Sequence, residues 1–247
     1  IRIDAAAAVA AVSGCAQTGD VTRSEPIVIQ GSDTEVQLVS SLVESFTGTH
    51  PDADISVTGG GSATGIAALL NGEADIANSS RPLNEQEKTS ASGQGMEIAE
   101  FILARDGLSV VVHPSNGVDA LTLGQVGSIF RGETTNWKDV GGTDAPIVLY
   151  GRQSTSGTYG FFRDAVVKDD YADTLRQMEG SQAIVDAVIA DKNGIGYVGV
   201  GYVKAETGEV RTDMKVLGIS AAEGQPVASP LDEAAVLDGR YPISRPI

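Results

Sequence analysis

Gly151-Arg152-Gln153-Ser154-Thr155-Ser156-Gly157-Thr158 separates an apolar run, Pro146 to Tyr150, from a second apolar stretch, Tyr159 to Val167. The first run is typical of a buried strand and the second of a helix. The hydroxyl residues therefore fall where the helix begins, and the free backbone N–H groups at that end favour an anion. The arginine adds a planar guanidinium that suits carboxylate or phosphate. Taken alone, the segment is equally compatible with a simple helix cap beside a surface charge.

Two upstream segments repeat this strand-to-helix pattern. Gly59 to Gly65 follows a predicted strand at Asp54 to Thr58, and Gly31 to Thr34 follows another at Pro26 to Gln30. Glycines in such turns allow positive φ and let the backbone approach a ligand closely. The glycine-rich turn contains no lysine, so it is not the P-loop of nucleotide-binding proteins. Three turns with the same chemistry predict one shared anion site rather than three unrelated helix caps.

Strand and helix patterns alternate along the whole chain, which predicts an α/β fold. The 247 residues are 41% hydrophobic and 20% charged, enough for one large domain or two modest lobes. The net charge of −16 argues against nucleic acid or an anionic membrane surface as a partner. An anion site remains compatible with this charge, because surface carboxylates more than about 8 Å away are largely screened at physiological salt.

Eight motifs follow one another from about Ile27 to the end of the sequence, at Gly31 to Thr34, Gly59 to Gly65, Ala74 to Leu83, Ile129 to Gly132, Thr135 to Gly142, Arg152 to Thr158, Gly194 to Tyr197 and Tyr241 to Pro246. Together, and in this order, they give the chain a close resemblance to the periplasmic phosphate-binding proteins that feed ABC-type phosphate importers, which are type II periplasmic binding proteins. The resemblance implies a two-lobed α/β fold, each lobe a mixed sheet flanked by helices, with the ligand in the cleft between the lobes. It also implies that the protein captures inorganic phosphate and delivers it to ABC permease subunits, as a monomer and without a cofactor.

The resemblance divides the chain into two lobes, residues 26–105 and residues 106–240, with a return crossing at 241–247. The outward crossing is expected near Glu100 to Val112. Family members usually continue with further helices packed on the first lobe, so we expect that this part of lobe 1 is missing from the sequence.

The resemblance also assigns the oxyanion contacts. It implies a backbone N–H contact from Gly157. It implies further contacts from Thr34, Ser62, Arg152, Ser156 and Thr158 through their side chains. The best-known family members carry an aspartate after the third strand, which accepts a hydrogen bond from protonated phosphate, and this chain has Ser80 at that place. A serine can donate to phosphate or to sulfate, so another tetrahedral oxyanion remains an alternative ligand.

Four further residues are possible contacts, namely Ser32, Asp33, Gly61 and Arg81. Asp33 could supply the missing acceptor or could merely cap a helix. Arg81 could add a second positive group, but Pro82 restricts its backbone and favours a structural or rim role. Related proteins often place an acidic residue beside the site arginine, where this chain has Gln153 and Ser154, so the partner of that arginine stays open.

Residues 1–25 resemble the remnant of a signal peptide followed by a tether. Val12 to Cys15 resembles a bacterial lipobox, whose cysteine is lipidated after cleavage. The apolar run before it, Ala5 to Val12, is too short to span a bilayer. We therefore expect a periplasmic or cell-surface protein anchored through Cys15, and the alternative is a lone free cysteine in a disordered leader.

Catalysis is the main rival function. The chain has no Gly-x-Ser-x-Gly motif, and its two histidines, His50 and His113, each precede a proline. One cysteine and two histidines without ligand spacing predict no metal site. We expect a binding protein rather than a phosphatase or other enzyme, with a phosphate-sensing surface protein as a further alternative.

Overall fold

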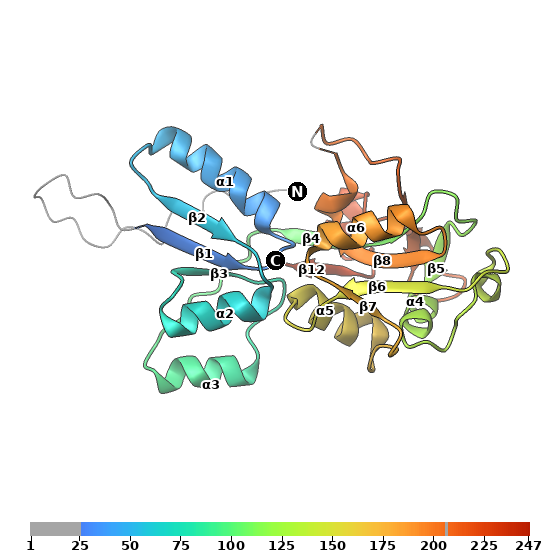
Figure 1. The fold of residues 1–247 in the computed structure, drawn as a ribbon, viewed down its shortest axis with the longest axis horizontal. Coiled ribbons are helices and arrows are strands. Elements are labelled where there is room, and N and C mark those ends of the chain that lie inside the picture. The colour runs from blue at the N-terminus through green and yellow to red at the C-terminus, as the bar shows by residue number, and fades with distance from the viewer. Residues whose placement is uncertain (1–25, 206) are drawn as a thin grey trace, which may run out of the picture.

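The computed structural model describes residues 26–205 and 207–247, which form two α/β lobes (Figure 1). Cys15 and the predicted lipobox lie outside the described residues. Within the described residues, no helix combines the length and the apolar character that a membrane span requires.

Lobe 1 contains a parallel sheet in the order β2-β1-β3. Its strands are β1 (Ile27–Gly31), β2 (Ile55–Thr58) and β3 (Ile76–Asn78), and its helices are α1 (Val36–Thr49), α2 (Ser62–Asn71) and α3 (Glu85–Gly93). Helix α1 packs on β2, α2 packs on β1 and β3, and α3 packs on α2. Because the strands are parallel, the turns that follow them meet at one edge of the sheet.

Lobe 2 is built on a mixed sheet in the order β12-β4-β8-β6-β7, with β9 paired to β4. The strands are β4 (Arg105–Val112), β6 (Val148–Arg152), β7 (Arg176–Met178), β8 (Gly194–Gly199), β9 (Lys215–Val216) and β12 (Ser244–Pro246). A small second sheet joins β5 (Ala120–Thr122), β10 (Gly218–Ser220) and β11 (Val227–Ala228). The helical segments are α4 (Leu123–Phe130), η1 (Trp137–Val140), α5 (Gly157–Phe162), η2 (Arg163–Val167), α6 (Gly180–Ala190), η3 (Val200–Val203) and α7 (Glu233–Leu237).

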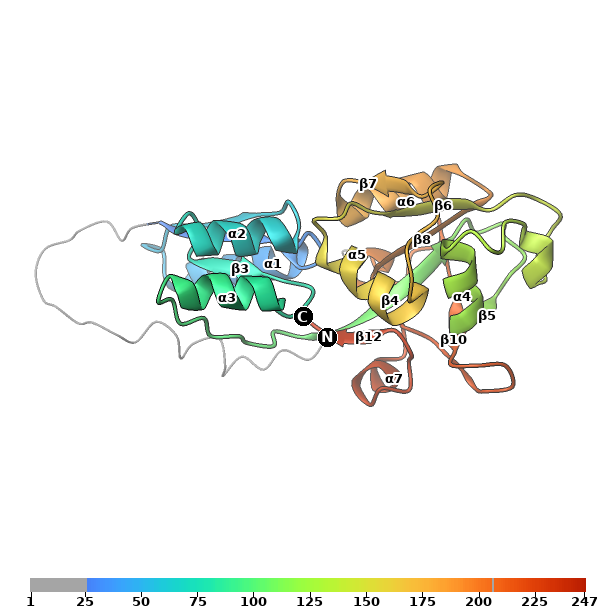
Figure 2. The ribbon, with the colours of Figure 1, turned by 90° about the horizontal axis from the view of Figure 1, so that it is seen from below.

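Helices cover both faces of the main sheet in lobe 2, with α6 on one side and α4 and α5 on the other (Figure 2). Two apolar clusters fill these layers, one containing Phe130 and Phe162 and the other containing Ile184 and Val188. The middle of β4 is fully buried, which explains why this strand is an almost continuous apolar run.

The two chain crossings between the lobes lie side by side. Strand β12 pairs antiparallel with β4, and Arg245 stands directly opposite Asp106 in this register. The N–H groups of Leu103 and Ala104 donate to the carbonyl of Ile247, over 2.7 and 2.9 Å. The crossings therefore form one two-stranded connection beside the contact between the lobes. The exact lobe boundaries stay a prediction.

Candidate functional site

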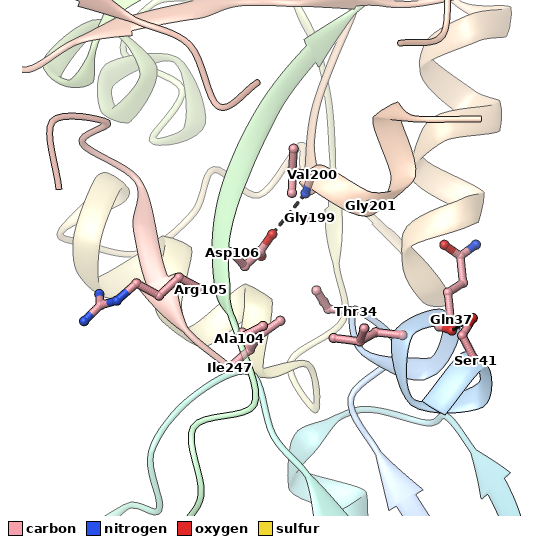
Figure 3. A pocket seen from close by; sticks show the side chains of 11 residues that line it. Thr34, Gln37, Ser41, Ala104, Arg105, Asp106, Gly199, Val200, Gly201 and Ile247 are labelled. Atoms are coloured by element: carbon pink, nitrogen blue, oxygen red, sulfur yellow. Dashed lines mark hydrogen bonds between the residues drawn. The ribbon is translucent and has the colours of Figure 1, made fainter. Parts of the chain in front are cut away.

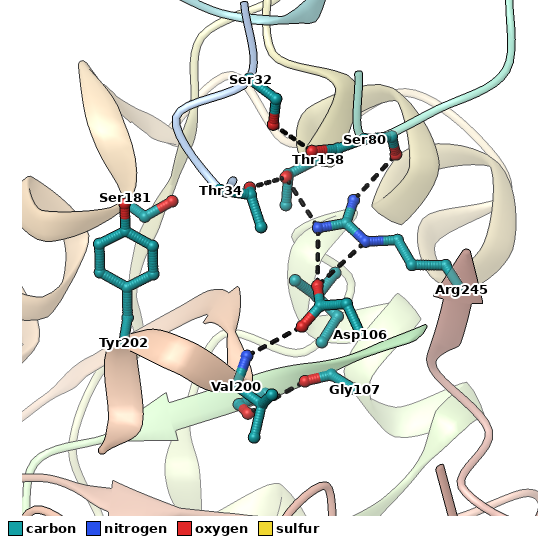
Figure 4. Close-up of polar contacts among 12 residues, drawn as sticks. Ser32, Thr34, Ser80, Asp106, Gly107, Thr158, Ser181, Val200, Tyr202 and Arg245 are labelled. Carbon is teal, nitrogen blue, oxygen red and sulfur yellow. Dashed lines mark hydrogen bonds and ion pairs between the residues drawn. The ribbon is translucent and has the colours of Figure 1, made fainter. Parts of the chain in front are cut away.

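The structure brings the three predicted turns together where the lobes meet, and Figure 4 shows Thr34 of the first turn beside Thr158 of the third. The hydroxyls of Thr34 and Thr158 bond to one another over 2.7 Å, although 124 residues separate them in sequence. The N–H of Ala63 donates to the carbonyl of Thr155 over 3.1 Å. One helix start from lobe 2 thus faces two turns from lobe 1.

Serine hydroxyls from lobe 1 extend this contact. Ser32 and Ser80 bond to one another through their hydroxyls. The Ser62 hydroxyl, at the first residue of α2, accepts the N–H of Ser80 over 3.0 Å. All three serines are buried, so their hydroxyls depend on partners within the site.

Glycine permits the close approach of the two helix starts. A Cβ on Gly157, the first residue of α5, would overlap the Ser62 hydroxyl. Gly61 has φ of +99° and lies against Thr155, whose carbonyl oxygen would be 2.8 Å from an added Cβ. Ser156 caps α5 by accepting the N–H of Tyr159 over 3.3 Å. The predicted contacts Gly61, Ser156 and Gly157 therefore all lie at the boundary between the lobes.

Arg152 is the last residue of β6 and is only 1% exposed. Its guanidinium forms a salt bridge with Asp33 of lobe 1. The same group donates to Ser181 and to Gln153, each over 3.1 Å. Asp33 also accepts the N–H of Gly60 over 3.1 Å. The arginine partner that the sequence left open is therefore a carboxylate from the opposite lobe.

The helix-cap alternative for Asp33 is wrong. The N-cap position of α1 is occupied by Glu35, and no side chain caps this helix. Asp33 instead uses its carboxylate across the cleft, because the turn places it two residues before the N-cap and opposite β6. In addition, the Tyr202 hydroxyl donates to the carbonyl of Asp33 over 2.5 Å.

A second buried ion pair, which the sequence reasoning missed, lies beside the hydroxyls. Arg245 donates to Asp106 over 3.0 and 3.2 Å, and the two side chains are 1% and 4% exposed. Arg245 also donates to the Thr158 hydroxyl over 3.0 Å and to the Ser80 carbonyl over 3.2 Å. The other Asp106 oxygen accepts the N–H of Val200 over 3.0 Å. Two features of the sequence could have indicated this pair, namely Asp106 just before the apolar stretch of β4 and Arg245 in the last motif.

Glu35 was also missed by the sequence reasoning. It is 2% exposed, and its N–H donates to the carbonyl of Ser32 over 3.1 Å. Burial raises the pKa of Glu35 to about 7, against the opposing effect of Arg245. One oxygen of Glu35 and the amide nitrogen of Asn78 are the buried side-chain polar atoms without a hydrogen-bond partner among the described residues.

Arg81 points to its own segment. Its guanidinium donates to both oxygens of Glu87, over 2.7 and 2.8 Å, and to the carbonyl of Pro82 over 2.9 Å. Glu87 in turn forms a capping box with Asn84 at the start of α3. This arrangement favours the structural alternative for Arg81.

A pocket of about 210 Å³ opens between α1, β4 and η3 (Figure 3). Thr34 and Asp106 line it together with Gln37, Gly199 and Ile247. Thr34 also bonds to Thr158, and Asp106 also bonds to Arg245. The pocket therefore leads from the surface to the edge of the site.

Comparison with known proteins gave consistent matches. The family described as the PBP superfamily domain matches residues 16–247. The phosphate-binding protein PstS of Pseudomonas aeruginosa is 31% identical over 229 residues, covering 87% of this chain and 68% of that protein. PstS of Staphylococcus haemolyticus is also 31% identical, over 222 residues, with coverages of 88% and 68%.

Solved structures agree with the sequence matches. A phosphate ABC transporter substrate-binding protein from Clostridium perfringens, solved with bound phosphate, has a TM-score of 0.77 at 30% identity, over 90% of this chain and 84% of that one. An ABC-type phosphate transport receptor from Vibrio cholerae has a TM-score of 0.66 at 29% identity, with coverages of 89% and 84%.

Proposed function

This chain belongs to the PstS phosphate-binding proteins of the PBP superfamily, and from that membership we infer that it captures inorganic phosphate and delivers it to the permease of an ABC importer. Such a receptor acts in the periplasm or at the cell surface. The observation that carries the inference is the meeting of two helix starts, buried hydroxyls and a buried arginine at the junction of two lobes.

We assign the phosphate contacts to both lobes. Lobe 1 supplies Thr34, Ser62 and Ser80, and lobe 2 supplies Arg152, Ser156, Gly157 and Thr158. The oxyanion would replace the direct bonds between hydroxyls, such as that between Thr34 and Thr158. Hydroxyls and N–H groups can hold an anion in this way without a net positive charge, because each charge-assisted hydrogen bond is stronger than a neutral one.

The two site arginines enter this scheme already paired with aspartates. Arg152 keeps N–H groups beyond those it gives to its aspartate, since a guanidinium carries five. Binding then requires the lobes to separate and close again around the anion. No bond of the ligand is broken, and within the part of the chain that the structure describes the histidine rings bond to Phe46, Thr49 and Ser115 of their own segments.

We also propose that the protein is anchored to the membrane by a lipid on Cys15. Cys15 lies outside the described residues, and its lipidation is supported by the lipobox resemblance alone. Expression of the precursor in a bacterial host, followed by mass spectrometry of the membrane fraction, would detect a diacylglyceryl-modified cysteine. Recovery of an unmodified thiol in the soluble fraction would contradict the anchor.

Calorimetry tests the binding site directly. Arg152→Ala and Ser62→Ala should each weaken phosphate binding by roughly tenfold or more, because each removes a hydrogen bond to a charged ligand. Arg163→Ala and Ser92→Ala are matched controls, since both side chains are exposed and outside the cleft. Unchanged affinity in both site variants would contradict the assignment.

A further inference from the structure

Glu35 differs from the other two carboxylates of the cleft in having an unused oxygen. Asp33 gives one oxygen to Arg152 and the other to a backbone N–H. Asp106 likewise accepts from Arg245 and from a backbone N–H. The Oε2 of Glu35 is buried and has no hydrogen-bond partner in the described chain. A buried acceptor of this kind is costly to keep, which makes it a candidate for a functional role.

Glu35 is connected to the proposed phosphate site through two serines. The carbonyl of Ser32 accepts the N–H of Glu35 over 3.1 Å, and the hydroxyl of Ser32 is bonded to that of Ser80. Both backbone polar groups of Ser80 are held in place, because its N–H donates to the Ser62 hydroxyl and its carbonyl accepts from Arg245. A hydroxyl can donate one hydrogen bond while accepting another, so these groups can form a directed chain.

We propose that Glu35, Ser32 and Ser80 form a hydroxyl relay that receives the P–OH hydrogen of monoprotonated phosphate and thereby discriminates against proton-free oxyanions such as sulfate. This inference rests on the proposed function and names the residues that determine specificity within the same site. Glu35 is a positioning residue in this relay, because it acts on the ligand through two serines.

The direction of the hydrogen bonds produces the discrimination. When Glu35 is ionised, Ser32 donates to the carboxylate and Ser80 donates to Ser32. The lone pairs of Ser80 then face the ligand and accept the hydrogen of phosphate. Sulfate has no hydrogen to donate, so one of its oxygens would face those lone pairs unfavourably. No proton is transferred and no covalent bond changes.

The protonation of Glu35 controls the direction of the relay. Burial is the main cause of the raised pKa of Glu35; among the charged groups, Arg245 of β12 lowers this pKa and Asp106 of β4 raises it. The Asp33–Arg152 salt bridge is the neighbouring charged pair of the cleft. A protonated Glu35 can donate to Ser32 and reverse the relay, which lets Ser80 donate to either anion. Discrimination should therefore increase as the pH rises through neutrality.

Calorimetry with phosphate and with sulfate, at about pH 6 and about pH 8, tests the relay in the wild-type protein, Glu35→Gln and Ser32→Ala. In the wild type, the ratio of the sulfate Kd to the phosphate Kd should rise by about tenfold between these pH values. Glu35→Gln should make this ratio roughly tenfold smaller at the higher pH, because a neutral amide replaces a charged acceptor.

Comparison at equal pH removes the contribution of phosphate's own ionisation. Glu44→Gln is the matched control, because Glu44 is exposed on the same helix and the charge change is identical. Ser32→Ala should lose the discrimination between phosphate and sulfate although Glu35 is still present. This variant therefore tests the relay even if Glu35→Gln does not fold. A ratio that keeps its wild-type value and pH profile in both variants would overturn the relay. Failure of the wild type to bind phosphate would instead refute the proposed function.

Discussion

At the residue scale, the cleft buries two arginines without leaving either charge unpaired. Arg152 pairs with Asp33 and Arg245 with Asp106, and each arginine has additional hydrogen bonds to serine or threonine. Burying an ion pair is expensive unless such additional bonds satisfy the remaining donors. Burial raises the pKa of Glu35, and the nearby charge of Arg245 offsets this only in part.

The stability of the protein should depend on the ionisation of Glu35. Burial raises its pKa from 4.5 to about 7, so between these values the folded protein binds the proton more strongly than the unfolded chain. Its stabilising contribution is complete below pH 4.5 and is lost as the pH rises to about 7, a change on the order of 3 kcal/mol. Urea denaturation should show Glu35→Gln gaining stability relative to wild type over this range. A constant difference, as expected for the control Glu44→Gln, would contradict the shift.

At the element scale, the site depends on strand-turn-helix units whose signals are local. Apolar runs followed by glycine and hydroxyl residues predicted the strands before all three turns, and β1, β2 and β6 lie there. The partners of those turns could not be predicted in this way. Asp106 and Arg245 are 139 residues apart, and only the pairing of β4 with β12 brings them together. Nothing in the local pattern at Glu35 distinguishes a buried carboxyl from a solvated helix start.

The approach of α5 to α2 should require glycine at position 157. Alanine favours a helix, so Gly157→Ala should leave lobe 2 folded, but its Cβ would overlap the Ser62 hydroxyl. We expect phosphate affinity to fall by roughly tenfold or more, with stability changed by only about 1 kcal/mol. Gly48→Ala in α1 is the control, because its added Cβ would meet open space. Calorimetry and thermal denaturation of both variants measure the two effects, and wild-type affinity in Gly157→Ala would show that the helices need not approach.

At the scale of the whole molecule, two kinds of contact join the lobes. The paired crossings, β4 and β12, are continuous backbone, whereas the cleft is closed by side chains such as Tyr202 and Thr34. The first can act as a fixed connection while the second breaks and forms again. The net charge of −16 is therefore compatible with anion capture, since the proposed site offers neutral donors and paired arginines in the buried junction.

Removing one contact between the lobes should favour the open arrangement. Tyr202→Phe eliminates the bond to the Asp33 carbonyl, so the lobes should be more separated in phosphate-free solution. We expect a larger radius of gyration in small-angle scattering and phosphate binding weakened by about tenfold. Tyr171→Phe is the control, because that hydroxyl bonds within lobe 2. Equal scattering curves and affinities for both variants would refute a role for Tyr202 in closure.

The cross-strand pair of Asp106 and Arg245 has a consequence for the order of folding. During synthesis, Asp106 is made 139 residues before the arginine that neutralises it. The strands of the lobe 1 sheet all lie before residue 79, whereas β4 can pair with β12 only after Ser244–Pro246 has been synthesised. Contacts between residues so far apart in sequence form slowly, because the entropy cost of closing a long loop must be met before the contacts stabilise the chain. The ion pair beside the proposed phosphate site therefore forms only after β12 has been synthesised and has docked beside β4.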